Sequence, residues 1–249
     1  MFLYDFDGVL ISSVKEASLS GLNAVNKTSL RSFDQMPAGY FDLFFNNVFH
    51  FFNPYTLCVL ARWSNENCGT NQDKILTREE FATYAAKQTD IDPKTIVEYF
   101  YSIRVAFMES ASEEWLKLNE PFNPLWNTLI EYGSENVVIL TAKNQKAVLK
   151  LCHHYGLNVS EQNVYAGDNN VSKIENFKRI NERFKKEKYT FIDDHLKNLK
   201  DLNTAFNKGD EKPIDLVLCD WGYGSIDDYP HALELGFEVL GQRELIAKF

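Results

Sequence analysis

Residues 1–10 read MFLYDFDGVL, and this stretch decides the fold class. Apolar residues surround Asp5 and the run ends in Gly8, which predicts a short buried strand at residues 2–6 that leads into a turn. A charge inside an apolar run costs free energy unless it has a partner or a function. Asp5 and Asp7 are therefore candidate functional residues, against the alternative that they only end a strand and form a turn.

Similar short apolar runs recur in the second half of the chain, each bounded by polar residues or glycine as buried parallel strands are. They are NVVIL (136–140), VYAG (164–167), YTFID (189–193), IDLVLCD (214–220) and FEVL (237–240). Helical patterns lie between them: one ends at Gly156, and another opens with Ser172 and Glu175 as a capping box. The alternation predicts an α/β fold with a doubly wound parallel sheet and right-handed crossovers.

The segment from about residue 12 to 120 shows almost no strand pattern and several helix starts, so we expect a helical insert after the first strand. Thr77 with Glu80 is a capping box, and Asp92-Pro93 and Asn123-Pro124 are each typical of a cap followed by proline at the first helical position. The aromatic run at 40–52, YFDLFFNNVFHFF, predicts the core of the insert, with a wall over a substrate as the alternative.

Composition excludes several classes of protein. The 249 residues are 45% hydrophobic and 24% charged, as in ordinary globular proteins, and the net charge of −9 without a long basic run argues against nucleic-acid binding. The N-terminal stretch lacks a basic leader and no segment reads as a membrane span, so we expect a cytoplasmic protein without a standard signal peptide. Four cysteines without CxxC spacing predict buried free thiols.

Polar residues follow four of the predicted strands, at the end where ligands bind to a parallel sheet. They are Asp5 and Asp7 after the first strand, Thr141 after VVIL, Lys173 at the start of the helix after VYAGDNN, and Asp193 with Asp194 at the end of YTFI. Converging carboxylates form an oxygen-rich site that suits Mg²⁺.

These residues in this order resemble the four motifs of the haloacid dehalogenase-like (HAD) hydrolase superfamily: DxDGV at 5–9, Thr141, Lys173 and the acid pair at 193–194. The tail DLVLCDWGYG followed by LGFEVLGQREL is similar to phosphoglycolate phosphatase-like members. The resemblance implies a Rossmann-like core at 1–12 and 121–249 and a helical C1 cap domain at 13–120. The roughly thirty residues between Thr141 and Lys173 are too few for the other cap type.

The resemblance further implies a phosphatase that hydrolyses a small phosphorylated metabolite with Mg²⁺. Asp5 would be the nucleophile, Asp7 the acid and base, and Thr141 and Lys173 would hold phosphoryl oxygens. Metal ligands would be Asp5, Asp193, a backbone carbonyl of Asp7, and Asp194 either directly or indirectly. Alternatives are a phosphomutase or phosphotransferase with the same nucleophile, and a non-catalytic metal-binding interaction module. A haloacid dehalogenase is disfavoured because it needs no acid such as Asp7, and a receiver domain because its motifs come in another order.

Several further polar residues are weaker candidates for the site. Lys143 and Lys178 compete with Lys173 for phosphate, and the capped helix start favours Lys173. Asn198 fits a DDxxxN pattern but is expected on a helix surface. Structural roles are expected for the remainder: His195 in a loop, His153 and His154 in the last turn of a helix, and Trp221 against the sheet end. The insert also contains Arg62 and Arg104, but their spacing does not indicate which ligand they would bind.

Overall fold

The computed structural model describes residues 1–70, 73–168, 171–209 and 213–249, so Asn169 and Asn170 of the VYAGDNN stretch lie outside the described residues. The described chain divides into two compact units, Met1–Ser12 with Glu120–Phe249, and Ser13–Asn119. The chain leaves the first unit and returns to it through two short antiparallel strands, β2 (Ile11–Ser12) and β3 (Glu120–Pro121).

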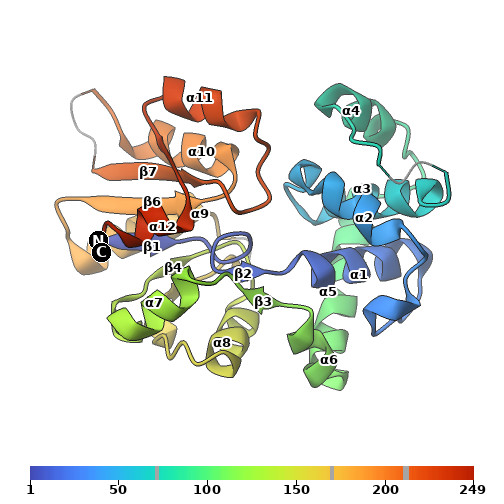
Figure 1. Cartoon of the computed structure of the whole chain (residues 1–249), viewed down its shortest axis with the longest axis horizontal. Helices are drawn as coiled ribbons and strands as arrows, with labels where there is room; N and C mark the ends of the chain where they lie inside the picture. The colour runs from blue at the N-terminus through green and yellow to red at the C-terminus, as the bar shows by residue number, and fades with distance from the viewer. Residues whose placement is uncertain (71–72, 169–170, 210–212) are drawn as a thin grey trace. The chain divides into compact units, whose positions relative to one another are not determined.

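The first unit is built on a six-stranded sheet with the order β5-β4-β1-β6-β7-β8, and each neighbouring pair of strands is parallel (Figure 1). The strands are β1 (Phe2–Tyr4), β4 (Ile139–Leu140), β5 (Val164–Tyr165), β6 (Tyr189–Asp193), β7 (Ile214–Cys219) and β8 (Glu238–Leu240). The predicted α/β fold with a parallel sheet is confirmed. The observed β4 and β5 are shorter than the predicted runs, and a 3-10 turn, η3 (Ser134–Asn136), occupies the segment just before Val137.

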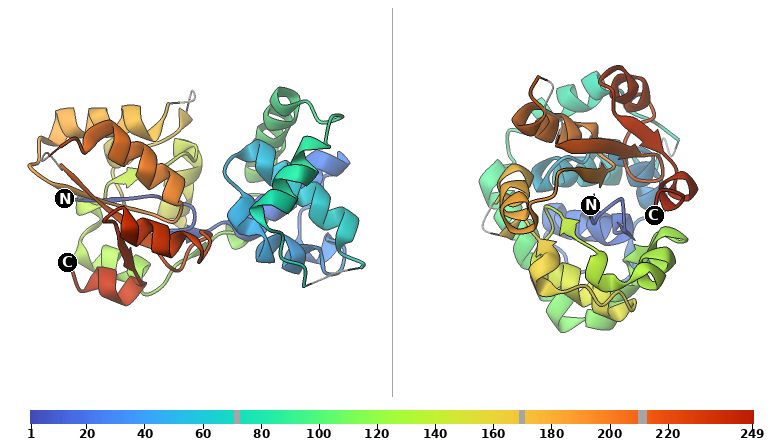
Figure 2. Two further views of the ribbon diagram at one scale, coloured as in Figure 1. Left: turned by 90° about the horizontal axis from the view of Figure 1, so that it is seen from above. Right: turned by 90° about the vertical axis from the view of Figure 1, so that its left-hand side faces the viewer.

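Helices cover both faces of this sheet (Figure 2). They are α7 (Leu125–Tyr132), α8 (Gln145–His154), α9 (Lys173–Phe184), α10 (Leu196–Phe206), α11 (Asp228–Glu234) and α12 (Gln242–Ile246), with a 3-10 turn η4 (Glu161–Asn163). Successive strand residues point to opposite faces. Accordingly, Leu3 packs in one buried cluster with Phe177 of α9 and Leu199 of α10, whereas the ring of Tyr4 lies 6.4 Å from that of Phe249 beyond α12.

The order of the strands reverses at β1. From β1 the chain continues, after the second unit, to β4 and β5 on one side, and then crosses back to β6, β7 and β8 on the other. Ligands of doubly wound sheets bind at such a switch point, outside the carboxyl ends of the strands. The residues that follow β1 and β6 are therefore the first candidates for a ligand-binding site.

The second unit is helical and contains α1 (Val14–Asn26), α2 (Tyr40–Asn46), α3 (Pro54–Asn67), α4 (Arg78–Ala86), α5 (Pro93–Ser110) and α6 (Ser112–Lys117), with 3-10 turns η1 (Phe33–Gln35) and η2 (Val48–His50). The predicted caps Thr77 and Asp92 are confirmed, because each side chain accepts a hydrogen bond from the backbone of the first helical turn. Of the aromatic run, Tyr40 and Phe44 are buried, whereas Phe45 is exposed.

A helix starts where the Asn123-Pro124 pattern predicts one, but one residue later than predicted. Helix α7 begins at Leu125, Pro124 is the residue before it, and the Asn123–Pro124 peptide bond is cis. Among the residues that the structure describes, no helix is both long and apolar enough to cross a membrane.

Candidate active site

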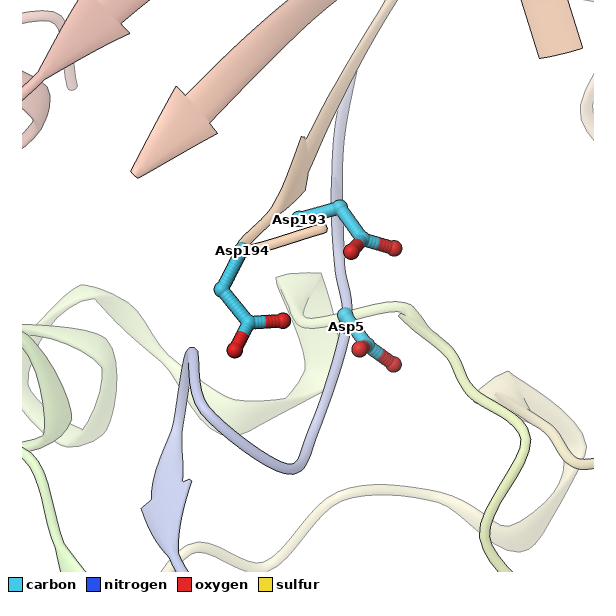
Figure 3. Close-up of side chains that lie close together, drawn as sticks. All are labelled: Asp5, Asp193 and Asp194. Atoms are coloured by element: carbon cyan, nitrogen blue, oxygen red, sulfur yellow. The ribbon is translucent and has the colours of Figure 1, made fainter. Parts of the chain in front are cut away.

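Asp5 and Asp193 lie side by side because they end neighbouring parallel strands. Tyr4 pairs with Ile192 in the register of β1 and β6, and the backbone N–H of Asp5 donates to the carbonyl of Ile192 at 2.9 Å. Asp194 follows directly. Each of the three aspartates offers a carboxylate oxygen within 4.8 Å of the others, and all three are buried (Figure 3).

Of these three aspartates, Asp193 accepts the most hydrogen bonds from the described residues. It accepts from Lys173 Nζ at 2.5 Å, from the backbone N–H of His195 at 2.8 Å, and from Nδ2 of Asn198 at 3.1 and 3.0 Å to its two oxygens. The expectation that Asn198 is a helix-surface residue is therefore wrong, because the first turn of α10 brings its amide back over the end of β6. Four donated bonds hold this carboxylate in one orientation.

Asp5 and Asp194 differ from Asp193, because each keeps one buried oxygen, Oδ1, that makes no hydrogen bond with the described residues. The other oxygen of Asp194 accepts from the backbone N–H of Tyr223 at 2.8 Å. Burial raises the pKa of Asp5 to about 8 and also raises the pKa of Asp194, with the neighbouring carboxylates acting in the same direction. Buried polar oxygens are almost always satisfied, so Oδ1 of Asp194 in this acidic cluster points to a missing positive partner.

Lys173 brings an ammonium into contact with this cluster, where it donates to Asp193. Its Nζ also lies 3.0 Å from Oδ1 of Asp5, an ion pair whose angles do not make a hydrogen bond. Burial alone would lower the pKa of Lys173, but Asp193 and Asp5 outweigh burial and raise it. Lys178, which the sequence offered as a competitor, is exposed on α9.

Thr141 and Lys143 follow β4, the neighbour of β1 on the other side. Thr141 is buried, and its Oγ1 accepts from the backbone N–H of Lys143 at 3.1 Å. Because this contact uses a lone pair, the hydroxyl proton of Thr141 can still be donated to a ligand. The ammonium of Lys143 donates to Oδ1 of Asp7 at 2.8 Å, a contact that the sequence pattern did not reveal.

Two glycines make room for Asp194. A Cβ on Gly8, whose φ is +81°, would lie 2.0 Å from Oδ2 of Asp194, and a Cβ on Gly222 would lie 2.3 Å from its Cβ. Trp221 anchors the same loop, since its indole N–H donates to the carbonyl of Val9 at 3.0 Å. The turn after Asp7 and the loop after β7 thus form a socket for this carboxylate.

Other sequence candidates lie away from this cluster or act structurally. His153 and His154 occupy the last turn of α8, as predicted, and His195 precedes α10. In the second unit, Arg104 pairs with the buried Glu16, and Arg62 pairs with Asp90 at 2.7 Å and with Glu66. The prediction of buried free thiols is confirmed for all four cysteines, Cys58, Cys68, Cys152 and Cys219.

The donor set fits a hard divalent cation. Two oxygens on opposite sides of a Mg²⁺ ion are about 4.2 Å apart, close to the 4.8 Å limit within which oxygens of Asp5, Asp193 and Asp194 lie. Three carboxylates face the single ammonium of Lys173, so the fully ionised cluster carries a net negative charge that a divalent ion would balance. All the ligand atoms are oxygens, as Mg²⁺ prefers.

Comparison with solved structures places this fold. The chain is similar to a predicted phosphoglycolate phosphatase from Haemophilus somnus 129pt, with 15% identity and a TM-score of 0.61 over 99% of this chain and 96% of that one. It is also similar to a HAD family hydrolase from Deinococcus radiodurans R1 with bound phosphate and sodium, at 13% identity and a TM-score of 0.52, covering 98% and 92% of the two chains.

A third similar structure is Protein Tyrosine Kinase A from Mycobacterium tuberculosis, with 15% identity and a TM-score of 0.52 over 91% of this chain and 86% of that one. Neither a family model nor a curated protein sequence matches the chain. At these identities the likeness is one of fold. The chain has the fold of HAD hydrolases of the phosphoglycolate phosphatase type, as the sequence motifs predicted.

Proposed function

We propose that the chain is a Mg²⁺-dependent phosphatase that hydrolyses a small phosphate monoester through an aspartyl-phosphate on Asp5. The observation that supports this most is the cluster of three buried carboxylates at the switch point of the sheet, in which Oδ1 of Asp194 has no hydrogen-bond partner among the described residues and Oδ1 of Asp5 forms an ion pair with Lys173. The shared fold with a HAD hydrolase that binds phosphate supports the same class of reaction.

The cation would be held by carboxylate oxygens of Asp5 and Asp194, with Asp193 and the backbone carbonyl of Asp7 completing the protein ligands. Asp193 already accepts four hydrogen bonds, so its contribution would be partly to orient Lys173. When bound, the cation would neutralise the carboxylates, which otherwise repel a phosphate by about 4 kcal/mol per charge pair at 4 Å.

In this reaction each of the four candidate catalytic residues would have its own role. A carboxylate oxygen of Asp5 attacks phosphorus while Asp7 gives a proton to the leaving oxygen; Asp7 then takes a proton from the water that hydrolyses the acyl phosphate. The hydroxyl of Thr141 and the ammonium of Lys173 hold the phosphoryl oxygens. We assign residues 13–120 to a cap domain, the substrate to the small phosphorylated metabolites, and the enzyme to the cytoplasm.

The test is a panel of phosphate monoesters, assayed with and without Mg²⁺ for the wild type and for Asp5→Asn. We expect turnover by the wild type only with the cation, and none by Asp5→Asn although it folds. Residual activity of the variant above about a tenth would require another nucleophile, because loss of covalent catalysis costs far more than the roughly 1.4 kcal/mol that a tenfold change represents.

A phosphotransferase is the second candidate, favoured by the fold shared with a protein named a tyrosine kinase. Both reactions begin with the same phosphorylated aspartate and differ in the acceptor. Release of inorganic phosphate in step with ester consumption supports the phosphatase, whereas a phosphorylated acceptor without free phosphate supports the transferase. Steady turnover of either kind would exclude a non-catalytic metal-binding module.

A further inference from the structure

Lys143 is a buried cation that the proposed chemistry does not use. Its side chain is 2% exposed, and its Nζ donates to Oδ1 of Asp7 at 2.8 Å. The side chain of Asp7 is 25% exposed, so it is the member of the pair that solvent and a ligand can reach. A lysine is seldom buried to this extent unless it is paired.

We propose that Lys143 is a positioning residue for Asp7, whose ammonium aims the carboxyl group at the leaving oxygen. This inference rests on the proposed phosphatase function. Asp7 lies on the turn after β1 and its side chain is partly exposed, whereas the Lys143 side chain that donates to it is almost fully buried. A general acid must lie within hydrogen-bond reach of the proton's destination, so a fixed partner increases the productive fraction.

The reaction balances without any change at Lys143. In the first half, the Asp5–phosphorus bond forms, the bond to the leaving oxygen breaks, and the proton of Asp7 passes to that oxygen. Asp7 is then a carboxylate, and the ammonium of Lys143 stabilises it in place. In the second half, water attacks phosphorus, its proton passes to Asp7, and the Asp5–phosphorus bond breaks. Lys143 keeps its protons throughout.

The competing role for Lys143 is direct contact with the transferring phosphoryl group. The two roles differ in whether Lys143 acts through Asp7 or independently of it. A residue that acts through Asp7 matters only where Asp7 matters, namely for leaving groups that need a proton. A residue that binds the phosphoryl group matters equally for every ester and also for inorganic phosphate.

The experiment measures kcat/KM, with Mg²⁺, for an aryl phosphate with a good leaving group and an alkyl phosphate with a poor one. The variants are Lys143→Met, Lys143→Arg, Asp7→Asn, the double variant Asp7→Asn with Lys143→Met, and Lys178→Met as an exposed lysine control. For the alkyl ester we expect Lys143→Met to lose about tenfold to hundredfold, part of the roughly 10²- to 10⁴-fold that acid catalysis provides. For the aryl ester we expect little loss, and Lys143→Arg should recover most of the alkyl activity.

The double variant gives the sharpest result, because residues that act as a unit are not additive. We expect it to be no slower than Asp7→Asn alone. Equal losses for both esters, a weaker inhibition by inorganic phosphate, or losses that multiply in the double variant would overturn the inference. If Lys143→Met does not fold, as judged by its near-ultraviolet circular dichroism, Lys143→Gln takes its place. Wild type and Asp5→Asn, assayed in parallel, report on the phosphatase function separately.

Discussion

The ammonium of Lys173 lies 2.5 Å from Oδ2 of Asp193, and the Asp193 side chain is fully buried. Lys173 begins the helix that follows β5, and Asp193 ends β6, so the pair joins elements from the two sides of β1. The same ammonium lies 3.0 Å from Asp5. Stability, cation binding and the proposed chemistry therefore depend on one small group of charges.

Removing the ammonium should destabilise the fold when no cation is bound. Lys173→Met leaves Asp193 and Asp5 buried without their counter-charge, and breaking a buried pair in this way costs about 3–5 kcal/mol. Urea denaturation in the presence of a chelator measures this loss. Lys178→Met, on the exposed face of the same helix, should stay within about 0.5 kcal/mol of the wild type. A Lys173→Met protein as stable as the wild type would show that the carboxylates do not need this charge.

Stability without a cation should fall as the pH rises. The pKa of Asp5 is about 8 in the folded protein, above its ordinary value of 3.8, so the folded state holds this proton more tightly than the unfolded chain does. This group therefore costs no stability below about pH 4, costs more as the pH rises from about 4 to 8, and costs a constant amount above that. The raised pKa of Asp194 acts in the same direction.

The variant Asp5→Asn isolates this effect, because an amide cannot ionise. The free energy of unfolding, measured in chelator at pH 5 and pH 8, should fall by a few kcal/mol more for the wild type than for the variant. Added Mg²⁺ should stabilise the wild type more at pH 8 than at pH 5, since a metal ligand must give up its proton. Parallel pH profiles for the two proteins would contradict the raised pKa.

The socket around Asp194 should not tolerate a methyl group. In Gly222→Ala the added Cβ would lie 2.3 Å from Cβ of Asp194 and 2.6 Å from the carbonyl oxygen of Gly8, so the loop must shift. We expect a loss of about 1–3 kcal/mol in stability and weaker binding of Mg²⁺ by calorimetry. Gly69→Ala is the control, because no atom of the described residues apart from its chain neighbours lies within 4 Å of its Cβ position. Unchanged Mg²⁺ affinity in Gly222→Ala would show that Asp194 does not depend on this socket.

Asn198 should matter for the site although it lies on a helix. The side-chain amide of Asn198 donates to both oxygens of Asp193. In Asn198→Ala this buried carboxylate loses these hydrogen bonds, which should lower the free energy of unfolding by about 1–3 kcal/mol. We expect lower stability and a reduced kcat for phosphate esters. Lys200→Ala, on the exposed face of α10, is the matched control. Equal activity of Asn198→Ala and Lys200→Ala would show that the contact of Asn198 with Asp193 does not matter for the reaction.

Local pattern predicted where the strands lie better than where they begin and end. The run YTFID coincides with β6, whereas the NVVIL run keeps only Ile139 and Leu140 as a strand, because the 3-10 turn η3 occupies its start. The Asn123-Pro124 pattern predicted the start of α7 one residue too early. A proline just before a helix and a proline in its first turn cannot be told apart from these two residues. The parallel fold followed from the alternation of elements, which does not depend on these boundaries.

The site was less accessible to sequence reasoning than the fold. The acids and Thr141 follow strands directly, so the topology alone brings them to one edge. The contact of Lys143 with Asp7 joins residues 136 positions apart, and nothing local in the sequence shows how far a lysine reaches. The DDxxxN spacing of Asn198 was visible, but only the path of α10 shows that its amide turns back to Asp193.

The most direct measurement is chemical trapping of the phosphorylated intermediate. Wild-type protein is mixed with Mg²⁺ and a phosphate ester that it hydrolyses, and the reaction is quenched with borohydride. Peptide mass spectrometry then locates the modified residue. The reduction converts an aspartyl-phosphate to homoserine, and we predict this change at position 5, dependent on the ester and absent from Asp5→Asn. Turnover without homoserine at position 5, or with the modification at another aspartate, would contradict the proposal that Asp5 is the nucleophile.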